Sequence, residues 1–84
     1  MKGTVCAINK QRGMVAIKTE TDGFSIFELF GDDNFNLGDE ISWSEDTPLG
    51  DCKVKNHTED EFAEVYFQNH GVTEGNLRTQ LLLN

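Results

Sequence analysis

The chain has 84 residues, which is the size of one domain. Its formal net charge of −8 at pH 7 excludes the strongly basic proteins that bind nucleic acids indiscriminately. No apolar run approaches the ~20 residues that span a membrane, and the N-terminus lacks the long apolar core of a signal peptide. We therefore expect a cytoplasmic protein without a membrane segment.

The first thirty residues read as three short strands joined by tight turns, over residues 3–9, 13–20 and 24–30. In the second strand, Val15, Ile17 and Thr19 share one face and are the expected core residues. Asp22-Gly23 is a strong hairpin signal. The third strand has apolar residues on both faces, so one face is core and the other is covered or binds a ligand.

Two further strands follow a loop that is rich in turn-forming residues. Residues 40–45 alternate with Ile41 and Trp43 inward, and residues 52–58 alternate with Cys52 and Val54 inward. Five short strands without a crossover helix predict an all-β fold, a five-stranded antiparallel barrel. Cys6 and Cys52 lack CxxC or metal-ligand spacing, so we expect two buried free thiols.

Residues 59–68 match two patterns. Thr58 and Glu61 form a capping box, and Phe62, Val65 and Tyr66 share one helical face, which slightly favours a helix. The high strand propensity of residues 65–67 keeps a strand open as the alternative.

The last segment predicts a short helix over residues 74–83. Thr73 is the expected N-cap, and Leu77, Leu81 and Leu82 form the apolar stripe. The chain is thus divided into a barrel over residues 1–58 and a C-terminal extension over residues 59–84, packed on the same domain.

The first three strands carry a resemblance to a known family. Residues 2–9, KGTVCAIN, resemble the opening K-G-x-V-K-W-F-N of bacterial cold-shock domains. Residues 12–17, RGMVAI, stand where that family has K-G-F-G-F-I, and residues 26–30, IFELF, stand where it has V-F-V-H-F. Looser matches at residues 37–43 and 50–56 extend the resemblance over residues 2–58.

The resemblance implies an OB barrel that binds single-stranded RNA or DNA on the face of strands one to three. In that family, aromatic side chains on this face stack on bases. At the corresponding positions this chain has Ala7, Met14, Ala16 and Leu29, which leaves Phe27 and Phe30 as the stacking candidates.

The expected function is therefore weak binding of single-stranded nucleic acid. Before residue 19 every charged residue is basic, and from residue 19 to residue 50 every charged residue is acidic, which predicts one mildly positive edge. Phe27 and Phe30 would stack on bases, and Met14 would lie against one. The candidate phosphate contacts are Lys2, Lys10, Arg12 and Lys18.

The alternative is a protein-interaction module, or a homodimer, on a barrel that has lost nucleic-acid binding. A face with Met14, Ala16, Phe27 and Leu29 is apolar, and such a patch suits a protein partner. If the C-terminal helix covers this face instead, the same residues are simply core.

Catalysis has few candidates in this sequence. His57, His70 and the acidic run at residues 59–61 are not placed by any nucleophile–base motif or phosphate-binding loop. Turn formation and favourable interaction with a helix dipole explain them more simply. We expect a non-enzymatic protein with no catalytic residue, no cofactor and no metal.

Overall fold

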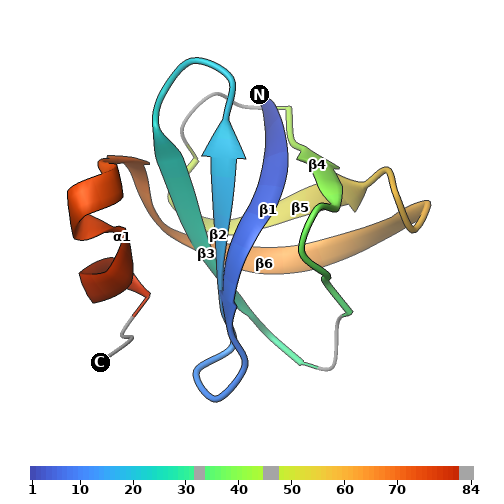
Figure 1. The fold of residues 1–84 in the computed structure, drawn as a ribbon. Coiled ribbons are helices and arrows are strands. Elements are labelled where there is room, and N and C mark those ends of the chain that lie inside the picture. The colour runs from blue at the N-terminus through green and yellow to red at the C-terminus, as the bar shows by residue number, and fades with distance from the viewer. Residues whose placement is uncertain (32–33, 45–47, 82–84) are drawn as a thin grey trace.

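The computed structural model describes residues 1–31, 34–44 and 48–81. These residues form six strands and one helix, which in chain order are β1 (Lys2–Asn9), β2 (Met14–Thr19), β3 (Phe24–Leu29), β4 (Glu40–Ser42), β5 (Gly50–Asn56), β6 (Glu61–Val72) and α1 (Glu74–Gln80). All pairings are antiparallel, and the strands close into a barrel in the order β1-β2-β3-β6-β5-β4. Figure 1 shows α1 on the outside of the barrel, beside β3 and the end of β6.

The predicted all-β barrel is confirmed, with six strands in place of five. The additional strand is β6, so the favoured interpretation of residues 59–68 as a helix is wrong. Val65 and Phe67 are buried whereas Glu64 and Tyr66 are exposed, which is the period-two alternation of a strand. The hydroxyl of Thr58 accepts a hydrogen bond from the backbone N–H of Glu40 at 2.9 Å, and caps no helix.

The extra strand is an integral part of the barrel. β6 pairs with β3 on one side and with β5 on the other, and α1 follows directly after it (Figure 1). The barrel therefore continues to Val72, and α1 is the element that lies outside it.

The barrel interior is filled by large apolar side chains. The ring centroids of Phe27 and Phe67 are 5.3 Å apart, and those of Trp43 and Phe67 are 4.9 Å apart. The buried members of this core are Val5, Val15, Ile17, Phe27, Phe35, Ile41, Trp43, Val54, Val65 and Phe67. The inward-facing residues predicted for the second and fourth strands and Val54 of the fifth thus lie where the alternation placed them.

A buried polar contact joins the loop before β4 to the end of β5. Asp39 and Asn56 are each 3% exposed, and the Asn56 amide donates to the Asp39 carboxylate at 2.8 Å. The backbone N–H of Asn36 donates to the same carboxylate oxygen at 3.0 Å. These bonds satisfy groups that would be costly to bury alone, and they fix the loop against the barrel.

Candidate interaction surface

α1 covers the part of the outer face of β1, β2 and β3 that carries apolar side chains. Met14, Ala16 and Ile26 are buried on this face in contact with Val72 and Leu81. The half-buried side chains packed around them are Ala7, Phe24 and Leu77. The predicted apolar face is thus divided between two cores. Met14 and Ala16 lie beneath the C-terminal helix, as one alternative expected, whereas Phe27 and Leu29 pack in the barrel interior.

The helix itself is shorter than predicted and is fixed at its end. The side chain of Asn9 donates a buried hydrogen bond of 2.8 Å to the backbone oxygen of Leu81. Thr73 stands at the N-cap position, but its side chain makes no capping hydrogen bond. Leu82, the last member of the predicted stripe, lies outside the described residues.

The strand register corrects the predicted role of Phe27. Val15 pairs with Phe27, and both side chains point into the barrel, where Phe27 is fully buried. An enclosed ring has no face available to a base, so Phe27 is a core residue. Met14 is also buried, at 7% exposed beneath α1, so its side chain is not available to lie against a base. The outward-facing residues of β3 are Phe24, Ile26 and Glu28.

The remaining predicted contacts lie on two separate parts of the surface. Lys10 and Arg12 are exposed on the turn between β1 and β2. Phe30 lies at the same end of the barrel, because the Leu29 N–H bonds to the Gly13 oxygen at 2.8 Å, and it is 59% exposed. Lys2 and Lys18, by contrast, border a hollow on the outer face of β1, β2 and β4.

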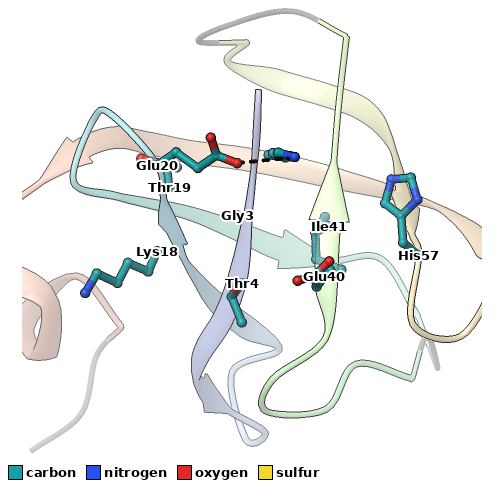
Figure 2. A pocket seen from close by; sticks show the side chains of 9 residues that line it. Gly3, Thr4, Lys18, Thr19, Glu20, Glu40, Ile41 and His57 are labelled. Atoms are coloured by element: carbon teal, nitrogen blue, oxygen red, sulfur yellow. Dashed lines mark ion pairs between the residues drawn. The ribbon is translucent and has the colours of Figure 1, made fainter.

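This hollow has a volume of about 360 Å³ and lies over Gly3 (Figure 2). A Cβ atom on Gly3 would lie 2.4 Å from the Lys18 backbone oxygen, so the close approach of β2 requires glycine here. Lys2 is 3.5 Å from Glu20, and Glu40 and His57 also line the hollow. The mixture of opposite charges gives this hollow no preference for an anion.

Both histidines contact a serine side chain. Ser42 Oγ and His57 Nε2 are 2.6 Å apart, and Ser25 Oγ and His70 Nδ1 are 2.8 Å apart. His70 also bonds through Nε2 to the backbone oxygen of Pro48, and its ring stacks on the core ring of Phe67. It therefore joins the segment before β5 to the barrel. Within the described ranges, neither histidine bonds to a carboxylate and no cluster could hold a metal ion.

A second outer face, formed by β3, β5 and β6, carries exposed aromatic side chains. We call it the aromatic face, and its residues are Glu28, Phe30, Asp51, Lys53, Lys55, Phe62, Glu64, Tyr66 and Gln68. Phe62 is 63% exposed and Tyr66 is 42% exposed. Phe30 packs edge-to-face against Tyr66 with ring centroids 6.4 Å apart. A helical pattern puts Phe62 and Tyr66 in one apolar stripe with Val65, whereas the strand exposes the first two and buries the third.

Two carboxylates and two amines lie toward opposite ends of the aromatic face, and Glu64 lies between them as the cross-strand partner of Lys53. Asp51, Tyr66 and Glu28 are cross-strand neighbours, so two carboxylates flank the tyrosine. At the other end, the amines of Lys53 and Lys55 lie 5.3 and 5.4 Å from the centroid of the Phe62 ring.

The cysteines do not fit the expected pair of buried thiols. Cys6 is exposed and Cys52 is half-buried, and no disulfide joins the two. Partial burial of the Cys6 thiol raises its pKa, and this exceeds the lowering effects of its backbone hydrogen bond and of Lys18. A raised pKa lowers the fraction of Cys6 that is present as thiolate, the reactive species.

Comparisons of the chain with protein-family models, with curated proteins and with solved structures gave no match. Among the described residues, no helix has the length and apolar character needed to cross a membrane.

Proposed function

We propose that this protein is a non-enzymatic binding module that contacts a protein partner through the aromatic face. The observation that supports this proposal is the contrast in coverage: α1 occupies the outer face of β1–β3, whereas the aromatic face is open. Phe30, Phe62 and Tyr66 all expose aromatic rings on this one face. Exposed aromatic side chains of this kind are typical anchors of protein interfaces.

Electrostatics favour a protein over a nucleic acid as the partner. The aromatic face carries three carboxylates, of Glu28, Asp51 and Glu64, and two amines, of Lys53 and Lys55, within a molecule of net charge −8. A negatively charged surface repels the phosphates that supply most nucleic-acid affinity.

Single-stranded RNA or DNA, the ligand implied by the cold-shock resemblance, is the competing candidate. The residues left for it are Lys10, Arg12 and Phe30, which are exposed at the same end of the barrel. The burial of Met14 and Phe27 removes two of its predicted contacts.

The proposal is tested with peptides selected on the folded protein from a random library. We expect the selected peptides to lose about tenfold or more in affinity when Tyr66→Ser or Phe62→Ser removes an aromatic anchor. The matched control is Leu37→Ser, which removes a 67% exposed leucine from the loop before β4 and should leave affinity unchanged. Equal losses in all three variants, or binding of a single-stranded nucleic-acid pool that shifts Lys10 and Arg12, would reject the proposal.

A further inference from the structure

We infer that the acidic end of the aromatic face is a docking site for an arginine side chain of the partner. This inference rests on the proposed function and names the chemistry that the face recognises. The site consists of the two rings of Phe30 and Tyr66 and the two carboxylates of Glu28 and Asp51.

The rings provide two aromatic surfaces for a cation. Their planes are 86° apart, so Phe30 and Tyr66 form two sides of an open box. A side chain at Gly50 would lie beside the tyrosine, with its Cβ 3.8 Å from the ring, so the glycine keeps this approach uncovered. Guanidinium groups bind such ring faces through cation–π contact and planar stacking.

The carboxylates lie on both sides of Tyr66. Because neighbouring strands are about 4.8 Å apart, the backbones of Asp51 and Glu28 are about 10 Å apart across the tyrosine. Gln68 donates to Glu28 Oε1 at 3.0 Å, which orients this carboxylate and leaves its second oxygen for a ligand. Within the described part of the chain, Asp51 makes no ion pair.

The chain's own cations do not occupy this site. Lys53 follows Asp51 by two residues on the same face, yet its amine lies 5.3 Å from the Phe62 ring. Lys55 contacts the same ring and is paired with Asp60 at 3.6 Å. The face thus already uses cation–aromatic contact at its basic end, while the rings at its acidic end are open to a cation from a partner.

The charge pattern favours arginine over lysine and over an apolar anchor. A planar guanidinium can lie on one ring and donate to carboxylates on either side, whereas an ammonium is a compact, strongly hydrated point charge. A purely apolar side chain would leave Glu28 and Asp51 partly desolvated without a partner, which is unfavourable.

The test uses acetyl-Arg-Val-Arg-amide as the probe and its citrulline analogue as the neutral isostere. In NMR titrations of the labelled full chain, we expect the arginine peptide to shift the amides of Glu28, Asp51 and Tyr66, and the citrulline peptide to shift none. Glu28→Gln combined with Asp51→Asn should weaken binding at least ~10-fold. Tyr66→Phe should retain binding and Tyr66→Leu should lose it, which separates a requirement for the ring from mere bulk.

The matched control is Glu74→Gln, which removes an exposed carboxylate from α1 and should leave affinity unchanged. Equal weakening by Glu74→Gln, or shifts spread over all acidic surfaces, would overturn the inference in favour of nonspecific attraction to a negative protein. If the library-selected peptides bind the aromatic face but lack arginine, and citrulline binds as well as arginine, the inference fails and the proposed function stands. If neither probe nor selected peptide reaches this face, the proposed function fails as well.

Discussion

The two outer faces of the barrel differ in their residues and in what covers them. The face of β1–β3 presents aliphatic side chains such as Met14, Ala16 and Ile26, and α1 buries them. The aromatic face presents rings separated by charged residues and lies open to solvent. β3 is the boundary, because Ile26 lies beneath α1 whereas Glu28 is exposed. The difference shows that α1 buries apolar residues on the face that the cold-shock resemblance implies for binding.

Removal of α1 tests this comparison with the largest expected effect. A chain that ends after Thr73 exposes Met14, Ala16 and Ile26, so we expect it to lose more than about 3 kcal/mol of stability and to associate. Urea unfolding measures the loss, and sedimentation measures the association. A truncated chain that is monomeric and as stable as the parent would show that α1 is not part of the core.

A single substitution in each face gives the next largest contrast. Leu81→Ala removes a fully buried side chain at the C-cap of α1, and we expect it to destabilise the protein by about 2–4 kcal/mol. Phe62→Ala removes an exposed ring, and we expect a change within about 0.5 kcal/mol. Both free energies of unfolding come from urea titration. Comparable losses in the two variants would contradict the assignment of one face as covered and the other as open.

The edge-to-face pair on the aromatic face should contribute a smaller energy. A double-mutant cycle of Phe30→Ala and Tyr66→Ala is expected to give a coupling energy of about 0.5–1 kcal/mol, as for other aromatic pairs. Thermal unfolding of the four proteins measures this energy. A coupling of zero would mean that the two rings do not form the box on which arginine docking depends.

The smallest expected effect concerns Cys6. Because the pKa of Cys6 is raised, a smaller fraction of its thiol is deprotonated at a given pH than in a cysteine with the ordinary pKa. The thiolate is the species that reacts. We expect iodoacetamide to alkylate Cys6 more slowly at pH 8 than it alkylates a cysteine in a short peptide, with the rate still rising at higher pH. The control is the same protein unfolded in urea, in which the two rates should converge. A folded protein that reacts faster than the peptide would contradict the direction of the shift.

Local alternation was sufficient to predict the first five strands and most of the barrel core. It was not sufficient for β6, because Thr58 and Glu61 match the capping box of a helix. The hydroxyl of Thr58 instead accepts a hydrogen bond from the backbone N–H of Glu40, and local sequence does not encode this contact. The inward side of β3 was also undetermined, since both of its faces are apolar. The pairing of Val15 with Phe27 decides it, and this register is a tertiary property.

The candidate site was harder to predict than the fold. Its rings come from β6 and from the residue after β3, and they share a face only when residues 61–72 form a strand. The carboxylates flanking Tyr66 come from two other strands, through pairings between residues far apart in the chain. By contrast, the coverage of the β1–β3 face was already one of the alternatives, because Leu77 and Leu81 gave the last helix an apolar stripe.

The most direct test of the central claim is chemical-shift mapping of the labelled protein with a library-selected peptide and, separately, with a single-stranded nucleic-acid pool at low salt. The account predicts that the peptide shifts Phe62 and Tyr66 and leaves Ala7 and Met14 unchanged, while the nucleic acid causes no shifts at millimolar strand concentration. Shifts on Lys10, Arg12 and Met14 that fade as salt rises would contradict it, because they would show that nucleic acid binds the face that α1 covers.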